Sequence, residues 1–255
     1  MPGMDAVQQD KAVQSQLPVG RVGLLGGTFN PVHIGHVRLA LEVGELLCLR
    51  RVDMMPCASP PHKPGTGLLP YALRVEMLRT AVQHLPSLGV STFEAELPQP
   101  SYTWNTAVAL HERTGETPLF ILGDEDFACL DTWRHGMDLP RVMDFAVVPR
   151  SGTAADLFFA TLRRFWPEAD VLEVEKGSGI FRAHMTEERS CWFLPLPMLE
   201  ISATRIRERW LRGANVRYLL PDPVLELLNA HKTDVSRIWG EARHDRALSS
   251  ACLYD

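Results

Sequence analysis

Short, mostly apolar runs recur along this chain, and between several of them the apolar residues follow helical spacing. Such runs are typical of strands buried on both faces of a sheet. They predict strands at residues 22–25, 52–55, 90–93, 119–122, 145–148 and 192–196. Residues 71–85 carry a helical apolar stripe, and residues 103–114 form a shorter helical pattern that stops before Gly115. We therefore expect an α/β fold of the Rossmann-like, doubly wound kind, with a mainly parallel sheet and helices on both of its faces.

The predicted strands also indicate where a binding site would lie. In a parallel sheet, ligands bind beside the carboxyl ends of the strands, and segments with glycine or polar residues follow predicted strands at 26–27, 60–63, 101–103 and 123–126. With 255 residues and 45% hydrophobic content, the chain can bury one full core. We expect a flexible arm at 1–19, a single domain at 20–232 and a polar tail at 233–255 with at most a short helix.

Composition and charge exclude several classes of protein. The net charge of −5 gives no basic footprint for nucleic acid. No apolar run approaches the length of a membrane span, and residues 1–19 are too polar for a signal peptide, so we expect a soluble, cytoplasmic protein. The five cysteines include no C-x-x-C pair, which argues against both a disulfide framework and a zinc site.

The chemistry of the chain concentrates in one strand-to-helix junction. Residues 26–36 read Gly-Gly-Thr-Phe-Asn-Pro-Val-His-Ile-Gly-His, directly after the first predicted strand. Gly26 and Gly27 let the backbone approach a phosphate closely, and a helix beginning near His33 points its unpaired N–H groups at the same place. His33 and His36 are three residues apart and share a helical face. This combination indicates a site for a nucleoside triphosphate.

A second helix start is a candidate for the triphosphate tail. Ser202 stands where a helix N-cap is expected, Thr204 adds a hydroxyl, and Arg207 follows one turn into a helix that runs to Gly213. Taken alone, this segment reads better as an ordinary serine cap on a basic amphipathic helix.

These motifs carry a resemblance. Thr28 and the run His33-Ile34-Gly35-His36 are similar to the signature of the nucleotidyltransferase superfamily, and the whole string at 26–36 resembles the bacterial nicotinate-nucleotide adenylyltransferases of NAD synthesis. Six further segments agree in order over about residues 20 to 232: 60–63, 101–103, 132–133, 148–152, 201–207 and 217–222. The resemblance implies a fold of the nucleotidyltransferase type and transfer of the adenylyl group of ATP to nicotinate mononucleotide, giving nicotinate adenine dinucleotide and pyrophosphate.

The resemblance also implies roles for individual residues. The catalytic donors would be His36, Thr28, His33, Lys63 and Arg207. The ATP site would comprise Gly26, Gly27, Thr28, Phe29, His33, Gly35, His36, Gly123, Glu125, Ser202, Thr204 and Arg207. The mononucleotide site would comprise Asn30, His62, Ser101, Tyr102, Thr103, Trp133 and Arg150. A pyridine ring with a carboxylate needs an aromatic face and N–H donors, which Trp133 and the backbone around Tyr102 and Thr103 could supply.

Two positions depart from the family pattern. The family usually has Gly, a variable residue and Asp after the fourth strand, whereas this chain reads Gly123-Asp124-Glu125-Asp126, so either Glu125 substitutes for that Asp or Asp124 reaches instead. Asn105 stands where an acid is common, and it could still cap the helix.

The expected mechanism needs no enzyme nucleophile. The acceptor phosphate, with a second pKa of about 6, would attack the α-phosphorus of ATP in line, and catalysis would consist of positioning and charge stabilisation. We expect Mg²⁺ to be held mainly by ATP phosphates and water, since no dense carboxylate cage is visible. The alternatives left open are a pantetheine-phosphate adenylyltransferase or cytidylyltransferase, a preference for the amide mononucleotide, and an inactive nucleotide-binding regulator.

Overall fold

The computed structural model describes residues 14–60, 67–150, 154–196 and 199–251; for 242–251 it describes the backbone only. Its centre is one eight-stranded sheet in the order β3-β2-β1-β4-β5-β8-β7-β6. The strands are β1 (Val22–Gly27), β2 (Arg51–Pro56), β3 (Leu88–Val90), β4 (Leu119–Gly123), β5 (Asp144–Val148), β6 (Asp170–Glu173), β7 (Phe181–His184) and β8 (Ser190–Phe193). The first six strands in that spatial order pair in parallel, while β7 pairs antiparallel with both β8 and β6.

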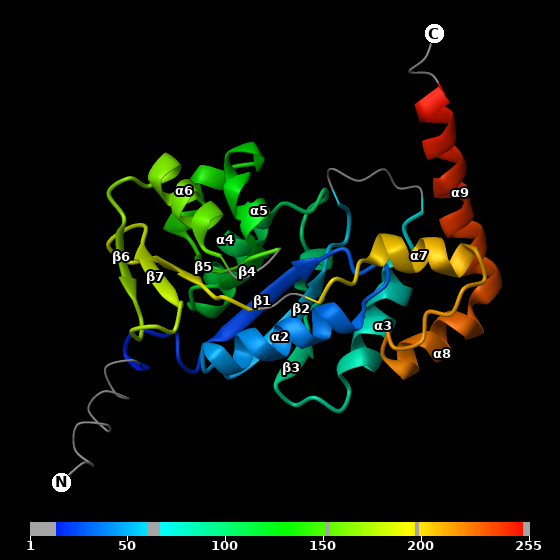
Figure 1. The fold of residues 1–255 in the computed structure, drawn as a ribbon, viewed down its shortest axis with the longest axis horizontal. Coiled ribbons are helices and arrows are strands. Elements are labelled where there is room, and N and C mark those ends of the chain that lie inside the picture. Colours follow the sequence, from blue (N-terminus) through cyan, green and yellow to red (C-terminus); the bar gives the residue numbers. More distant parts are fainter. Residues whose placement is uncertain (1–13, 61–66, 151–153, 197–198, 252–255) are drawn as a thin grey trace.

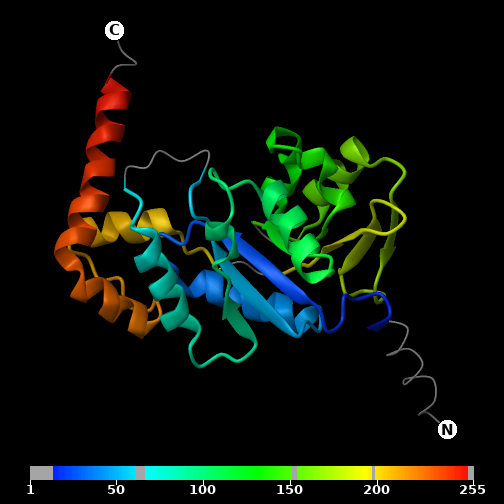
Figure 2. The same ribbon diagram turned by 180° about the vertical axis from the view of Figure 1, so that it is seen from behind.

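Helices cover both faces of the sheet (Figures 1 and 2). The α-helices are α2 (Ile34–Leu46), α3 (Tyr71–Val82), α4 (Thr103–Thr114), α5 (Asp124–Ala128), α6 (Asp156–Phe165), α7 (Ala203–Leu211), α8 (Asp222–Ala230) and α9 (Lys232–Ala251). Three short 3-10 helices complete the described elements: η1 (Phe93–Glu96), η2 (Leu130–Thr132) and η3 (Gly136–Arg141). The predicted doubly wound α/β fold is therefore confirmed.

Alternation along the strands explains the two layers. Leu24 of β1 packs into the core under α4, α5 and α6, and its neighbour Leu25 packs into the core on the opposite face, with α2, α3 and α8. Phe120 and Ile121 of β4 divide between the two cores in the same way. Successive side chains of a strand point to opposite faces, so a strand covered on both sides is apolar at nearly every position.

The order of the strands creates one crevice. From β1 the chain moves outward to β2 and β3, and from β4 it moves in the opposite direction to β5 and β8. The connections on the two sides of this switch point leave the sheet on opposite faces, so a ligand site forms beside the carboxyl ends of β1 and β4.

Several boundaries differ from the sequence expectation. The strand expected at 90–93 is β3, which ends at Val90, and Phe93 instead begins η1. Strands β6 and β7 were not predicted, because they are short and their side chains are mostly half-exposed. The helix expected at 71–85 ends at Val82. By contrast, α4 has the predicted bounds, and Gly115 ends it in the left-handed region with φ 69°.

The folded domain extends beyond residues 20–232 at both ends, which corrects the expected boundaries. The indole N–H of Trp192 donates to the Gln16 carbonyl at 2.8 Å, so part of the expected arm is docked. In the expected polar tail, Val235 and Trp239 of α9 are 0% and 2% exposed and belong to the core. Their spacing of four residues places both on one helix face, a pattern too sparse to read in a polar segment. No helix in the described part of the chain has the length and apolar character of a membrane span.

Candidate active site

The glycines at the end of β1 are required by close packing. A Cβ atom at Gly26 would lie 2.8 Å from the ring of Phe120, and one at Gly27 would lie 3.0 Å from the ring of Phe29. Neither glycine adopts a positive φ, whereas Phe29 does, with φ 48°. The turn that follows β1 is therefore held tightly against two aromatic rings, and the left-handed residue is a phenylalanine.

The two histidines lie together at the start of α2. The backbone N–H of His33, the N-cap residue, donates to Nδ1 of His36 at 3.2 Å. That bond leaves the ring proton of neutral His36 on Nε2. Burial lowers the pKa of His33 to about 4, so its imidazole is neutral at physiological pH. Gly35 makes room for this ring, because a Cβ atom there would lie 3.1 Å from Nδ1 of His33.

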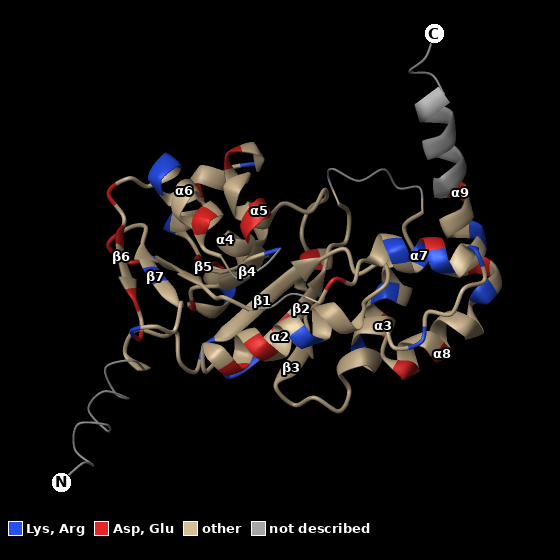
Figure 3. Ribbon diagram, viewed as in Figure 1, with Lys and Arg blue, Asp and Glu red and all other residues tan. Residues whose placement is uncertain are grey.

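The structure brings the second predicted phosphate segment to the first. Ser202 caps α7 by accepting a hydrogen bond from the Arg205 N–H at 3.2 Å. One guanidinium nitrogen of Arg207 donates to the Asn30 carbonyl at 2.7 Å, and the other donates to the Thr204 hydroxyl at 3.1 Å. Arginines gather on α7 (Figure 3). Residues 177 positions apart in the chain thus form one polar surface beside the β1–α2 turn.

The side chain of Asn30 is held by partners from distant parts of the chain. Its side chain is buried, donates to the Gly67 carbonyl at 2.7 Å and accepts from the Leu69 N–H at 3.2 Å. The indole N–H of Trp239 reaches the same oxygen at 3.4 Å. These partners occupy the amide, and Asn30 does not line the cavity. It ties together the β1–α2 turn, the segment before α3 and helix α9, and its place in the mononucleotide site stays a prediction.

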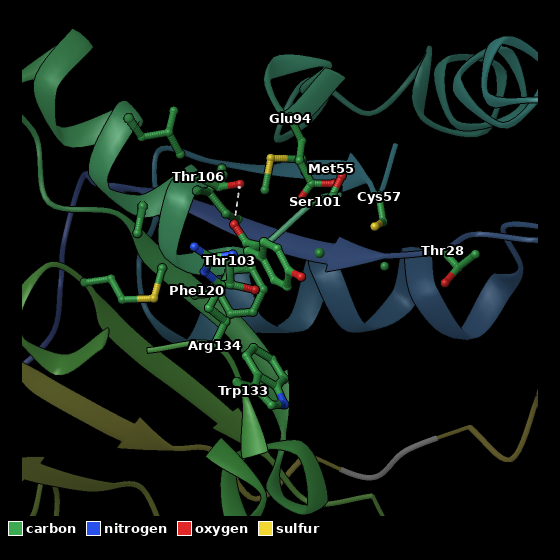
Figure 4. A pocket seen from close by; sticks show the side chains of 17 residues that line it. Thr28, Met55, Cys57, Glu94, Ser101, Thr103, Thr106, Phe120, Trp133 and Arg134 are labelled. Carbon is green, nitrogen blue, oxygen red and sulfur yellow. Dashed lines mark hydrogen bonds between the residues drawn. The ribbon is translucent and has the colours of Figure 1, made fainter. Parts of the chain in front are cut away.

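A cavity of about 260 Å³ opens at the carboxyl ends of β1 and β2, beside Phe120 of β4 (Figure 4). In that view Trp133 lies on the opposite side of the cavity from Glu94 and Met55, and Thr28 lies at one end. Seven residues predicted from the sequence line it: Gly26, Gly27, Thr28, Ser101, Tyr102, Thr103 and Trp133. The turn assigned to ATP and the residues assigned to the pyridine ring therefore share one cavity.

The start of α4 faces this cavity without a side-chain cap. Its N-cap is Tyr102, no side chain accepts from the first N–H groups, and the first turn contains no acidic residue. Asn105 lies within the helix, so it does not provide the expected cap. An uncapped helix start beside a cavity can accept an anion. Ser101 is buried and fixed by its hydroxyl, which accepts from the Ser59 N–H at 3.2 Å and donates to the Gln99 side chain at 3.0 Å.

Three charged or ionisable side chains around this cavity were not predicted. The guanidinium of Arg134 lies 4.8 Å from the centre of the Tyr102 ring, next to the start of α4. Glu94 is buried and accepts from the Ala58 N–H at 3.0 Å. Burial, together with the charge of Glu94, raises the pKa of the Cys57 thiol to about 11, so this cysteine is a neutral lining group. Each stands outside a recognisable motif, and only the fold brings them to the cavity.

The two acids after β4 have different surroundings. Oδ1 of Asp124 accepts from the backbone N–H groups of Glu125 and Arg150, both at 2.9 Å. Asp124 is buried and fastens the end of β5 to α5. The Glu125 carboxylate is exposed at the end of β4 and pairs with the Arg150 guanidinium at 3.2 Å. Asp124 is therefore committed to the fold, whereas the Glu125 carboxylate stays exposed to solvent. Gly123, the N-cap of α5, joins this segment to β4.

Two predicted residues, His62 and Lys63, lie outside the described residues. No group of three or more histidine, cysteine, aspartate or glutamate side chains suited to a metal occurs in the described part of the chain. The cavity is lined mainly by apolar and aromatic side chains, which suits a flat ring. Its polar groups are hydroxyls, the N–H groups at the start of α4, the Arg134 guanidinium and the buried Glu94 carboxylate.

Comparison with known proteins gives consistent matches. The model of the cytidylyltransferase-like family matches residues 24–209. A protein of Geobacter metallireducens with the printed name "Probable nicotinate-nucleotide adenylyltransferase" is 34% identical over 232 residues, which is 89% of this chain and 100% of the relative. A relative of the same name in Pseudomonas putida is 34% identical over 84% of this chain and 94% of its own length.

Solved structures agree on the fold. The Plasmodium falciparum nicotinic acid mononucleotide adenylyltransferase complexed with NaAD superposes with a TM-score of 0.63 at 14% sequence identity, covering 83% of this chain and 96% of that one. At this identity the likeness concerns the fold alone.

Proposed function

The chain belongs to the cytidylyltransferase-like family and, within it, to the nicotinate-nucleotide adenylyltransferases, and from this premise we propose how its cavity and its paired histidines carry out the reaction. That reaction transfers the adenylyl group of ATP to nicotinate mononucleotide and yields nicotinate adenine dinucleotide and pyrophosphate. One observation carries the assignment of the site: the turn at Gly26–Thr28 and the aromatic residues around Trp133 line the same cavity. Two substrates bound there would meet at their phosphates.

We propose that ATP lies with its phosphates between the starts of α2 and α7. Both helix starts carry partial positive charge. Nε2–H of His36, the Thr28 hydroxyl and the Arg207 guanidinium are the donors that would contact the phosphates. His33 would act as a neutral donor or acceptor, because its buried ring resists protonation. The resemblance alone supports the proposed roles of Lys63 as a catalytic donor and of His62 in binding the mononucleotide.

The mononucleotide would occupy the part of the cavity between Trp133 and the start of α4. The pyridine ring of the acceptor is cationic at its nitrogen, which favours an aromatic face such as Trp133. Its carboxylate would accept from the backbone N–H groups at Tyr102 and Thr103. The guanidinium of Arg134 lies beside the same helix start. Its positive charge would attract the carboxylate of the acid more strongly than the neutral amide substituent.

The chemical step is a direct displacement. The acceptor phosphate is mostly a dianion at neutral pH, since its second pKa is about 6, so one of its oxygens can attack the α-phosphorus without a general base. The bond to pyrophosphate breaks on the opposite side. The protein would orient the two substrates and stabilise the charge on the α-phosphate and on the leaving group.

Mg²⁺ is part of this proposal. When bound, it would neutralise charge on the ATP phosphates. Because the described residues offer no cluster of metal ligands, substrate oxygens and water would hold it. The protein itself would contribute hydrogen-bond donors to the phosphates, from His36, Thr28 and Arg207.

The stereochemistry at phosphorus tests the proposed displacement. ATP carrying one sulfur on the α-phosphate in a defined configuration is converted with nicotinate mononucleotide, and the product configuration is determined. A single in-line step inverts the configuration. Retention would require two displacements and a covalent enzyme intermediate, and would overturn the proposal.

A further inference from the structure

One buried arginine holds the turn that follows β1. Arg74 lies in the first turn of α3 and is 1% exposed. Its Nη1 donates to the carbonyls of Thr28 and Cys57, both at 2.8 Å, and its Nε donates to the Leu69 carbonyl at 3.1 Å. Side chains on a helix point toward its N-terminus, which lets this guanidinium reach three chain segments at once.

Removing the charge of Arg74 from water costs free energy, so its presence in the core indicates that its hydrogen bonds have a role. Arg74 forms no ion pair with any described residue, although the charge of Glu94 acts on it. Its hydrogen-bond partners are three neutral carbonyls, and its guanidinium also lies 5.4 Å from the centre of the Tyr71 ring. Burial lowers the pKa of the guanidinium from its usual value, although an arginine keeps its charge at neutral pH. An apolar side chain of similar volume would avoid the desolvation cost. An apolar side chain has no N–H donors, however, and so could not hold three carbonyls in fixed directions.

The bond to Thr28 fixes an unfavourable backbone conformation. A trans peptide points its C=O and N–H in opposite directions, so the Thr28 carbonyl on Arg74 turns the N–H of Phe29 away from Arg74. Phe29 has φ 48°, a left-handed value that residues with a side chain rarely adopt because it is strained. Such a conformation persists only where the surroundings enforce it.

The strained residue in turn supports the histidine at the start of α2. The Phe29 ring is 2% exposed and meets the imidazole of His36 edge to face, with ring centroids 4.9 Å apart. A contiguous path of contacts therefore leads from the Arg74 guanidinium through the Thr28–Phe29 peptide and the Phe29 ring to His36.

We infer that Arg74 is a positioning residue for adenylyl transfer, which acts by holding the Thr28–Phe29 turn in the conformation that seats the imidazole of His36. The inference rests on the proposed function, because it assigns His36 its place at the phosphates. Arg74 itself would touch no substrate. The competing explanation is that Arg74 only stabilises the fold.

A double-mutant cycle separates the two explanations. The variants are Arg74→Gln, His36→Ala and the pair, and kcat is measured well below each melting temperature. In the wild-type background, Arg74→Gln should lower kcat by about 10- to 100-fold, the range that a small misplacement of a catalytic group can cause. In the His36→Ala background it should lower kcat by less than about threefold, since the misplaced group is already absent.

Arg21 gives a matched control at the opposite end of the strands. Its guanidinium donates to Asp144 and to the Thr117 carbonyl, both at 2.7 Å. Arg21→Gln should lower the melting temperature and leave kcat unchanged. Should Arg74→Gln fail to fold, Arg74→Lys serves in the same cycle, because a lysine keeps the charge but lacks the planar fork.

A readout without substrate keeps this inference separate from the proposed function. The ring nitrogen signals of His36 are recorded by NMR in the ligand-free protein. Arg74→Gln should move them and Arg21→Gln should not. Unmoved His36 signals, an unchanged kcat, or an equal loss of kcat with and without His36 would each overturn the role of Arg74, whether or not the wild-type protein turns over nicotinate mononucleotide.

Discussion

The imidazoles of His33 and His36 stack face to face, with ring centroids 3.6 Å apart and ring planes 21° apart. His33 is the buried member of this pair, and its Nδ1 has no hydrogen-bond partner within the described structure. Placing two positive charges at this separation would be costly. Together with its burial, this arrangement favours a neutral His33, while Nε2–H of His36 is the donor that we propose for the phosphates.

Acid should destabilise the fold through His33. Burial lowers the pKa of His33 from its ordinary value of 6.5 to about 4 in the folded protein, so between these pH values the unfolded chain binds more protons than the folded one. Stability should then fall as the pH drops from 6.5 to 4, by about 3 kcal/mol at most from this residue. Denaturant unfolding at pH 7 and pH 4.5 measures the loss. His33→Gln should lose less stability over the same interval, and an identical loss would show that His33 is not responsible.

Removing the imidazole of His36 should impair the chemical step. His36→Ala should lower kcat by about 100- to 1,000-fold, as expected for a donor that acts on developing charge. The melting temperature should fall only modestly, because alanine removes one capping hydrogen bond at the start of α2 and the ring contacts of a half-buried side chain. Steady-state pyrophosphate release and thermal unfolding give the two quantities. An unchanged kcat would reject the assigned role.

Trp133→Ala should weaken binding of the mononucleotide more than binding of ATP. Loss of ring stacking is expected to raise KM for nicotinate mononucleotide about tenfold. Trp166 is a matched control, because it is also half-buried but packs on Phe127 away from the cavity. Trp166→Ala should leave both KM values near those of the wild type. Equal increases for the two substrates in Trp133→Ala would remove Trp133 from the ring site.

Arg134→Gln should reduce the preference for the acid over the amide mononucleotide. The guanidinium is exposed, so solvent limits its effect, and we expect KM for nicotinate mononucleotide to rise about three- to tenfold. KM for nicotinamide mononucleotide should change little. Arg141 provides the control, since it is exposed on η3 and pairs with Asp138 at 3.5 Å. A parallel rise for both mononucleotides in Arg134→Gln would mean that Arg134 does not read the ring substituent.

The sequence predicted the parts of the fold that depend on local patterns. The runs at β1, β2, β4 and β5 are apolar because helices cover both faces of these strands, and a glycine marks the end of α4. It did not predict β6 and β7, whose half-exposed residues lack an apolar run. It also did not predict the docking of α9, in which Val235, Ile238 and Trp239 are the described residues that pack against the core.

Some residues of the candidate site could be predicted from local motifs, and others could not. Residues in contiguous motifs, such as Gly26, Thr28 and Tyr102, line the cavity as expected. Asn30 belongs to such a motif, but its amide is committed to partners 37, 39 and 209 positions away. Arg74 and Arg134 were not predicted, because an isolated arginine on a helix or in a loop gives no signal until the fold shows what lies around it.

Pyrophosphate release is the most direct test of the assigned reaction. The protein is incubated with ATP and Mg²⁺, and with nicotinate mononucleotide, nicotinamide mononucleotide, phosphopantetheine or no acceptor, and one further arm contains nicotinate mononucleotide and a chelator in place of Mg²⁺. We predict rapid release with nicotinate mononucleotide and Mg²⁺, much slower release with the amide, and none in the other arms. Faster release with the amide or with phosphopantetheine, or no release with any acceptor, would contradict the account.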